Sequence, residues 1–418
     1  MEYTVSEKSQ KRFDSVVALP EIQDAIASIR EDHPFSMQEH REFVLCESPT
    51  FCEDARAALF AKRLTEYGLQ NVRIDADKNV WGIRRGSGTG PVILVEAHMD
   101  TVFPFGSVKE IRDENGIMYA PGATDNTRGM TALLAVLRAM NRCGIETEGD
   151  LIFCGTSREE GMGSLGGMRD FIAHGPKIDA SISVDGADTE AITCEATGYR
   201  TDEVNFYGIG GHAYSAFGLM ANPLHAAARA VAKIADFQVS DDPKTTFCVS
   251  NFHAGTDAGV HAIVPKATIR FNIRSNSQAL LNELEARVYQ AVQEACDEET
   301  ARWGKDTITW DSKRFCDVPA GKQDRHAPLV EAAVAASRFF TEPEKQENIA
   351  IRDGGCVNGN MAIGAGIPCV TIGGGSRNCC IHSLDEYFPY EGAYTLPQEI
   401  LTLLCIAAGV HGKVDPIF

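Results

Sequence analysis

The sequence predicts an α/β protein in which a mixed sheet is covered by helices on both faces and a smaller α+β domain is inserted. Two observations predict this fold. Short, nearly continuous apolar runs alternate with helical patterns, as expected of strands that are buried on both faces of a sheet. The chain of 418 residues is also too long for one ordinary hydrophobic core, so two domains are expected.

The first 80 residues are predicted to be helical. Polar and apolar positions follow helical spacing through Asp54–Tyr67, and Gly68 marks a turn after that helix.

Four apolar runs predict the strands of the main sheet: Pro91–Ala97, Leu151–Thr156, Ala180–Val184 and Pro368–Ile372. The pattern of Thr131–Asn141 predicts a helix between the first two strands. Ligands of such sheets bind beyond the carboxyl ends of the strands. Each of the four runs is followed, at or soon after its end, by a side chain that can bind a metal, so a site is expected there.

The middle of the chain changes character and predicts the inserted domain, residues 197–316. Its two alternating runs and two helical patterns are Thr201–Tyr207, Ala267–Ile273, Pro223–Phe237 and Leu280–Thr300. The other domain is then discontinuous and consists of residues 1–196 and 317–418.

Composition limits the partners. A formal net charge of −19 without a basic run argues against nucleic acid and anionic membranes, so a small-molecule substrate is expected. No apolar run reaches the roughly 20 residues of a membrane span, and the N-terminus has no signal-peptide pattern. The 13 cysteines have no CxxC spacing, which favours reduced thiols. We therefore expect a cytoplasmic protein.

Two pairs of candidate residues stand at or soon after predicted strand ends. His98 and Asp100 lie two residues apart, so they point to the same face, and Asp100 can orient a metal-binding imidazole. The alternative for them is an ordinary surface pair. Glu159 and Glu160 are adjacent and point in different directions, so one can bind a metal while the other faces the attacking water. Their alternative is a surface loop.

Three further candidates have local alternatives of their own. Asp125 precedes a predicted helix, where an N-cap is an equal interpretation. Asp185 ends an apolar strand and is otherwise a turn residue. His382 is otherwise part of a polar turn before a helix.

Together these candidates form a set of two imidazoles and three carboxylates: His98, Asp125, Glu160, Asp185 and His382. This mixture suits one or two divalent ions of zinc, manganese or cobalt, with one carboxylate as a bridge. Such a centre activates water and polarises an electrophile, while Glu159 shuttles the proton. The sequence therefore predicts a metal-dependent hydrolase that cuts a C–N bond.

The order of these motifs resembles the metallopeptidase family of the aminoacylase and carboxypeptidase-G type, which includes peptidase T and acetylornithine deacetylase. The motifs are His98-Met99-Asp100-Thr101-Val102, Gly122-Ala123-Thr124-Asp125, Glu159-Glu160-Gly161, Val184-Asp185 and Ile381-His382-Ser383-Leu384-Asp385-Glu386. The resemblance covers nearly the whole chain and implies a zinc-peptidase-like catalytic domain.

The resemblance also implies roles for individual residues. His98 and Glu160 would bind one metal ion. Asp185 and His382 would help to build the site for a pair of ions, and Asp125 would bridge the two ions. Asp100 supports a ligand, and Glu159 is the general base. The inserted domain corresponds to a lid and dimerisation domain, so a homodimer or higher homo-oligomer is expected. Its His212, after Gly211, would stabilise the oxyanion in a neighbouring subunit.

Several positions depart from the family pattern, among them Cys379-Cys380, which replaces a Gly-rich approach to the final histidine. Asn126 and Asn358 each stand where the family commonly has Asp, and Ala262, or His261 with a one-residue gap, stands where it often has Asn. We interpret these changes as altered contacts to a peptide carbonyl and terminal carboxylate. They favour a small, carboxylate-bearing, non-peptide substrate, for instance in an aromatic aminohydrolase of the 5-nitroanthranilate type, which releases ammonia.

Candidates for binding that substrate are Arg274, Arg352, Arg377 and Asn360. Each arginine has a surface or structural salt bridge as its alternative interpretation.

The sequence is also compatible with other functions. Within the same family they are a di- or tripeptidase, an exopeptidase and an N-acyl amino acid deacylase. A catalytically inactive binding or scaffold relative is the alternative from another class. Gly208–Ala213 fits GxGxxA but lacks a suitable acidic residue downstream, and no GxSxG nucleophile motif is present.

Overall fold

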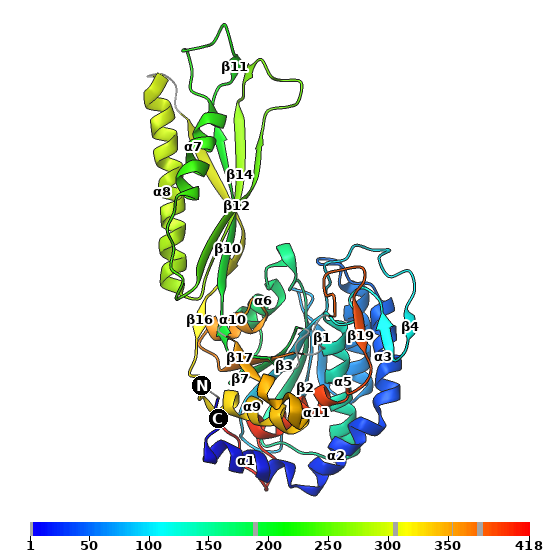
Figure 1. Ribbon diagram of the computed structural model, residues 1–418. Coiled ribbons are helices and arrows are strands. Elements are labelled where there is room, and N and C mark those ends of the chain that lie inside the picture. Colours follow the sequence, from blue (N-terminus) through cyan, green and yellow to red (C-terminus); the bar gives the residue numbers. More distant parts are fainter. Residues whose placement is uncertain (1–2, 187–190, 304–307, 353, 374–378) are drawn as a thin grey trace. The chain divides into compact units, whose positions relative to one another are not determined.

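The computed structural model describes residues 3–186, 191–303, 308–352, 354–373 and 379–418 (Figure 1). The chain divides into two compact units. The larger consists of Met1–Ala196 and Lys322–Phe418, and the smaller consists of Thr197–Gly321. The expected boundary at residue 317 falls inside a strand of the smaller unit, Thr309–Val318, so the division lies slightly later in the chain.

The larger unit is built on an eight-stranded mixed sheet. In spatial order its strands are β1 (Gln70–Ile74), β2 (Val80–Arg84), β6 (Asp150–Thr156), β3 (Val92–His98), β7 (Ala180–Val184), β18 (Cys369–Ile372), β8 (Ala191–Thr193) and β17 (Ala350–Arg352). Strands β6, β3, β7 and β18 are parallel to one another. Their carboxyl ends therefore meet at one edge of the sheet.

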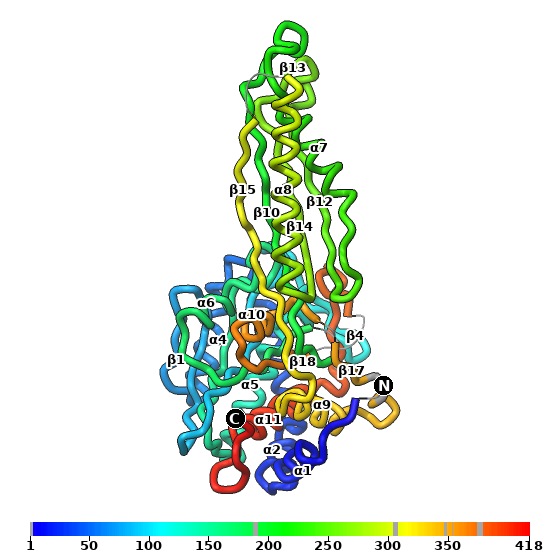
Figure 2. Tube along the Cα trace, turned by 90° about the vertical axis from the view of Figure 1, so that its left-hand side faces the viewer, coloured from blue at the N-terminus to red at the C-terminus, as the bar shows by residue number. Residues whose placement is uncertain are grey.

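Helices cover both faces of this sheet, as Figures 1 and 2 show. One face packs against α4 (Asp54–Glu66), α5 (Thr127–Arg142), α9 (Pro328–Phe340) and α11 (Thr395–Ala408). Helices α1 (Glu7–Val17), α2 (Pro20–Glu31) and α3 (His33–Leu45) form an outer layer on these. The other face carries α6 (Gly166–His174) and α10 (Gly359–Gly364).

The alternation along β3 shows how the two faces are filled. Val95 and Ala97 join the larger core beneath α5, whereas Leu94 joins the core beneath α6 and α10. Because side chains alternate along a strand, Glu96 and His98 point to the same face as Leu94. The carboxyl group of Glu96 therefore lies two residues before the predicted metal ligand His98 on the same face of the sheet, and both side chains are at most 1% exposed.

Shorter elements complete the larger unit, and the last of them, β16, begins at the final residue of the smaller unit. They are the three-stranded sheet β19 (Tyr387–Pro389), β5 (Ile117–Tyr119) and β4 (Arg112–Glu114), the 3-10 helices η1 (Gly161–Gly163) and η2 (Pro343–Asn348), and the short strands β9 (Glu195–Ala196) and β16 (Gly321–Lys322).

The smaller unit is an antiparallel sheet with two helices. Its strand order is β12 (Thr245–Ala254), β14 (Lys266–Ser275), β10 (Gly198–Tyr207) and β15 (Thr309–Val318). Helices α7 (Pro223–Ala235) and α8 (Gln278–Trp303) bury the apolar face of this sheet. A separate pair joins β11 (Gly211–His212) to β13 (Ala262–Ile263). The two predicted strands and two predicted helices are present as β10, β14, α7 and α8, and the sheet also contains β12 and β15.

The predicted fold class is confirmed, but the helical prediction for the first 80 residues is wrong beyond Gly68. Residues Gln70–Ile74 form β1, an edge strand paired antiparallel with β2. All but one of its side chains are exposed, so this segment has no apolar run to mark it as a strand. No helix among the described residues is long and apolar enough to cross a membrane.

Candidate metal centre

The candidate ligands come from loops at the carboxyl edge of the sheet. His98 is the last residue of β3, Asp185 directly follows β7, and Glu160 follows β6. Asp125 precedes α5, and His382 lies in the segment between β18 and β19. Parallel strands place these separate segments together, as expected for a site at this edge.

The ligand atoms converge closely. His98 Nε2 lies 2.9 Å from Asp125 Oδ1 and 3.8 Å from Asp185 Oδ1. His382 Nε2 lies 3.1 Å from Asp125 Oδ2 and 2.9 Å from Glu160 Oε1. Asp125 thus has one carboxylate oxygen towards each histidine. This is the geometry that a bridging carboxylate requires.

Asp100 supports the cluster through the backbone. Its Oδ1 accepts the N–H of Glu159 at 2.9 Å, and its Oδ2 accepts the N–H of Glu160 at 3.0 Å. His98 Nδ1 is 3.0 Å from the Asp100 carbonyl oxygen but 3.6 Å from the nearer Asp100 carboxylate oxygen. The backbone carbonyl, rather than the expected carboxylate, therefore fixes the tautomer of His98.

The N-cap of α5 is Asn126, not Asp125. Its Oδ1 accepts the N–H of Gly129 at 3.1 Å, while its Nδ2 donates to the Val184 carbonyl at 2.7 Å. An Asp at this position could cap the helix but could not donate to Val184. The side chain of Asp125 is thereby left to face the two histidines.

Burial and charge shift the ionisation of the cluster. Burial opposes the charged form of His98, but the carboxylates of Asp100 and Asp125 outweigh it and raise the pKa of His98 well above its ordinary value. Hydrogen bonding to Asp125 and Glu160 raises the pKa of His382 to about 10. Burial raises the pKa of Asp185 to about 8. The cluster therefore holds several buried carboxylates close together, and their negative charge is stabilised by nearby positive charge.

These residues fit a divalent cation. One ligand atom each from His98, Asp125 and Glu160 lies within 4.8 Å of the others, and all three residues are buried. Asp185 Oδ2 is buried and has no hydrogen-bond partner among the described residues. Such an unmatched carboxylate oxygen is costly unless a cation meets it. The mixture of imidazole and carboxylate donors is the one that zinc, manganese and cobalt accept.

Other predicted site residues lie elsewhere. His212 and Arg274 belong to the smaller unit, where His212 Nδ1 accepts the N–H of Tyr214 at 3.2 Å and Arg274 Nε donates to Asn272 at 3.0 Å. Ala262 pairs with His212 across β11 and β13, and the His261 carbonyl accepts the N–H of Ala213.

In the larger unit, Arg352 ends β17, the edge strand, with β7, β18 and β8 between it and β3. Asn360 is buried in α10, and its Oδ1 accepts the N–H of Val357 at 3.1 Å. Arg377 lies outside the described residues. The substrate-binding roles of these residues stay predictions.

Two supporting carboxylates were not assigned roles from the sequence. Glu386 is buried and accepts three backbone N–H groups of the loop that carries Asp125, those of Gly122, Thr124 and Asp125. Burial raises the pKa of Glu386 to about 7. It belongs to the same motif as His382, which is the signal that could have found it.

Glu96 is the second of these carboxylates. It accepts hydrogen bonds from Ser183, from Thr156 Oγ1 at 3.1 Å and from Asn358 Nδ2 at 2.9 Å. Asn358 is therefore committed to the protein interior, and our interpretation of this position as an altered substrate contact is wrong.

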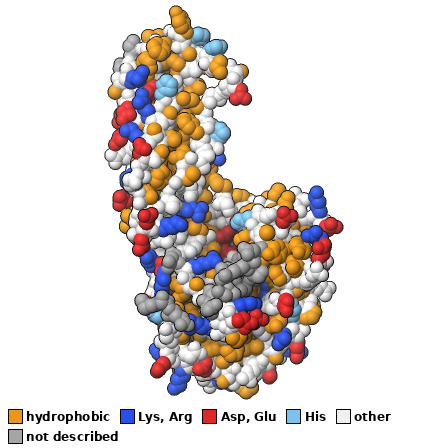
Figure 3. Space-filling model, in the orientation of Figure 1, with side chains coloured by type: hydrophobic (Ala, Val, Ile, Leu, Met, Phe, Trp, Pro, Cys, Tyr) orange, Lys and Arg blue, Asp and Glu red, His pale blue; other side chains and the backbone are white. Residues whose placement is uncertain are grey.

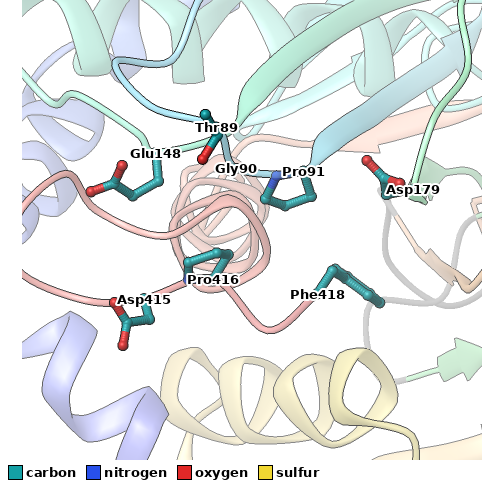
Figure 4. Close-up of a pocket in the computed structure, with 8 residues that line it drawn as sticks. All are labelled: Thr89, Gly90, Pro91, Glu148, Asp179, Asp415, Pro416 and Phe418. Carbon is teal, nitrogen blue, oxygen red and sulfur yellow. The ribbon is translucent and has the colours of Figure 1, made fainter.

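A cavity lies at the other end of the sheet (Figure 4). It measures about 560 Å³ and is lined in part by Pro91 and Asp179, which directly precede β3 and β7. Two of its carboxylates already have partners: Asp179 accepts the N–H of Val92, and Glu148 accepts that of Gly412. This cavity is thus distinct from the cluster at the carboxyl edge.

Comparison with known proteins identifies the family of this chain. Residues 94–405 match the model of peptidase family M20/M25/M40. The chain is 26% identical over 358 residues to a succinyl-diaminopimelate desuccinylase from Leptothrix cholodnii, covering 79% of this chain and 87% of that protein.

Solved structures have the same fold. A tripeptidase from Staphylococcus aureus superposes with a TM-score of 0.74 at 22% identity, covering 90% of this chain and 98% of that one. A dinuclear metal binding peptidase from Bacillus subtilis superposes with a TM-score of 0.65 at 16% identity, covering 91% and 99%. The family match confirms the resemblance drawn from the five motifs, and the chain belongs to peptidase family M20/M25/M40, whose members are metallohydrolases acting on amide and peptide C–N bonds.

Proposed function

We propose that this protein hydrolyses the amide C–N bond of a small substrate, either an N-acyl amino acid or a short peptide, with Glu159 as general base. The observation that carries this proposal is the pair of hydrogen bonds from Glu159 and Glu160 to Asp100. Asp100 fixes the backbone N–H groups of both glutamates. The carboxylate of Glu160 then contacts His382, and Glu159 lies beside the same cluster. Ligand and base are thus held by one anchor.

In this proposal His98, Asp125, Glu160, Asp185 and His382 hold one or two divalent ions. Such ions lower the pKa of water and polarise the substrate carbonyl. Glu159 accepts the proton of the attacking water as the new C–O bond forms. It then delivers that proton to the amine nitrogen as the C–N bond breaks.

His212 of the smaller unit is proposed to stabilise the oxyanion, acting from the partner in a homodimer. Its Nδ1 accepts backbone N–H groups of its own turn, which leaves Nε2 as the ring nitrogen that can donate to an oxyanion. Mixing His212→Ala with Glu159→Gln protein tests this role. Restored activity in the mixture supports action across subunits, and additive loss argues against it.

A second candidate is the hydrolytic removal of ammonia from a small aromatic acid such as 5-nitroanthranilate. It is favoured by large exposed apolar side chains on the loops of the metal ligands, among them Phe105 and Met162. Water would add to the ring carbon that bears the amino group, and ammonia would leave. Asn358 gives this candidate no support, because its side chain contacts Glu96 in the protein interior.

One experiment separates the candidates. Full-length protein loaded with manganese or zinc is given N-acyl amino acids, dipeptides and amino-aromatic acids including 5-nitroanthranilate. New primary amine and free ammonia are measured separately, and a chelator-treated sample is the control. Metal-dependent amine from the first two sets supports the proposal. Ammonia from the aromatic set alone would replace it with the second candidate, and no turnover in any set favours a binding or scaffold protein.

A further inference from the structure

Large apolar side chains are exposed on loops that carry candidate metal ligands and on the segment of residues 46–53. We call them the apolar rim: Phe51, Val102, Phe105, Met162, Ile381 and Leu384. Phe105 is 62% exposed and Leu384 is 67% exposed, which is unusual for side chains of this size. Single exposed apolar residues need no explanation, but a group gathered at one site does. Figure 3 shows hydrophobic side chains gathered on the visible face of the larger unit.

Chain position ties the rim to the ligands. Val102 is four residues after His98, Met162 is two after Glu160, and Ile381 directly precedes His382. His382 Nε2 is only 2.9 Å from Glu160 Oε1, so the segments bearing Ile381 and Met162 approach each other at the cluster.

Backbone hydrogen bonds hold the remaining loops together. The Thr101 N–H donates to the Ser48 carbonyl at 2.9 Å, which places the segment before Phe51 beside the segment before Val102. Glu53 Oε1 accepts the N–H groups of both Phe51 and Arg158, at 2.9 and 3.0 Å. The rim is therefore part of one connected set of loops.

Cations are scarce on these loops. Within residues 46–53, 99–106, 157–165 and 379–386, all of which the structure describes, the sequence has one lysine or arginine, Arg158. Its guanidinium donates to Asp170 at 2.8 Å and to the Asp77 carbonyl at 3.2 Å. A negatively charged substrate group beside the metal would thus find no uncommitted cation on these loops, whereas an apolar group would find contacts.

We propose that the apolar rim binds an apolar group of the substrate, aliphatic or aromatic, that lies next to the scissile C–N bond. Burying such a group against the rim removes apolar surface from water and is favourable in proportion to its size. This inference rests on the proposed function, because it takes the cluster between these loops as the site where the C–N bond is cut.

The first test is a substrate series with metal-loaded, full-length protein. N-acyl amino acids with acetyl, butyryl, hexanoyl and benzoyl groups are compared with succinyl, and side chains of Leu and Phe with those of Asp and Lys. The value of kcat/KM should rise about fourfold for each added methylene on at least one side of the bond. Equal values for apolar and charged members would overturn the inference.

Variants show whether the rim causes the preference. Phe105→Ser and Met162→Gln should each lower the ratio of kcat/KM for the apolar over the charged member at least fivefold. The matched control is Phe418→Ser, an exposed aromatic in the cavity at the amino ends of β3 and β7. It should leave the ratio unchanged. Rim variants that change the sedimentation of the protein but not this ratio would mean that the rim binds a protein surface, and would also overturn the inference.

A binding measurement keeps the inference separate from the proposed function. Acetate, butyrate, hexanoate and 3-phenylpropionate are titrated calorimetrically into the metal-loaded protein and into Phe105→Ser. Affinity that rises with the apolar tail in the wild type, and less in the variant, supports the inference even if no amide is turned over. An affinity independent of tail length overturns it even if amides are hydrolysed.

Discussion

The carboxylate of Glu386 accepts the backbone N–H of Asp125 at 2.9 Å, although both residues are acidic and buried. The same carboxylate accepts the N–H groups of Gly122 and Thr124 at 3.0 and 2.7 Å. Three backbone donors thus offset part of the cost of burying the Glu386 charge. The contact uses only the backbone of Asp125, so the Asp125 carboxylate remains directed at His98 and His382.

Replacing Glu386 with Gln should weaken metal binding. A glutamine amide can accept through only one oxygen, so its NH₂ group would face at least one of the three N–H donors. We expect a loss of metal affinity of about 10- to 100-fold, as for other groups that orient metal ligands. Calorimetric titration with manganese or zinc measures it. Asp385→Asn, at the neighbouring exposed position, is the control, and unchanged affinity in folded Glu386→Gln protein would contradict this role.

Adjacent glutamates should respond differently to the same substitution. Glu159→Gln is expected to retain metal but to lower kcat by about 10²- to 10⁴-fold, the range for a general base. Glu160→Gln is expected to lower metal affinity, because Glu160 Oε1 lies in the ligand cluster. Metal content after dialysis and kcat under saturating metal distinguish the two. Near-normal turnover by Glu159→Gln would remove Glu159 from the mechanism.

The sequence predicted the strands that are buried on both faces, because continuous apolar runs have no other ready explanation in an α/β chain. The run Ala180–Val184 coincides with β7, and Leu151–Thr156 lacks only the first residue of β6. Strand β1 was not predicted, because an edge strand with exposed side chains needs no apolar run. Continuous apolar runs thus indicate strands that are buried on both faces, and they do not indicate exposed edge strands.

The candidate ligands were predictable because each stands at or soon after a strand end or just before a helix, where chain order and topology fix its place. The supports beneath them were not. Glu96 and Asn358 are 262 positions apart in the chain, and no local pattern indicates that they meet. Asn358 was therefore misinterpreted as a substrate contact.

Asn358→Asp should destabilise the protein, because it would place a second carboxylate against Glu96. Asn358 Nδ2 now donates to Glu96 Oε2 at 2.9 Å and to Thr156 Oγ1 at 2.7 Å, and an aspartate can donate neither bond when ionised. We expect the free energy of unfolding at pH 8 to fall by about 2–4 kcal/mol. Denaturant titration measures this loss.

A compensating change tests the same contact. Glu96→Gln in the Asn358→Asp background returns one donor and one acceptor to the pair, with the roles exchanged. Most of the lost stability should return. A double variant no more stable than Asn358→Asp would mean that the destabilisation has another cause.

Glu399→Gln should stabilise the protein at alkaline pH and much less under acidic conditions. Glu399 is buried in α11, and its Oε1 has no hydrogen-bond partner among the described residues. Burial raises the pKa of Glu399 to about 8, from an ordinary value of 4.5. The folded state therefore binds this proton more tightly than the unfolded state does, and stability is lost as the pH rises from about 4.5 towards 8. Glutamine removes that loss, so we expect a gain in unfolding free energy of roughly 2 kcal/mol at pH 8 that shrinks towards pH 5. Thermal denaturation at the two pH values, with the exposed Glu391→Gln as control, measures the difference. A gain of equal size at both pH values would show that ionisation of Glu399 is not its source.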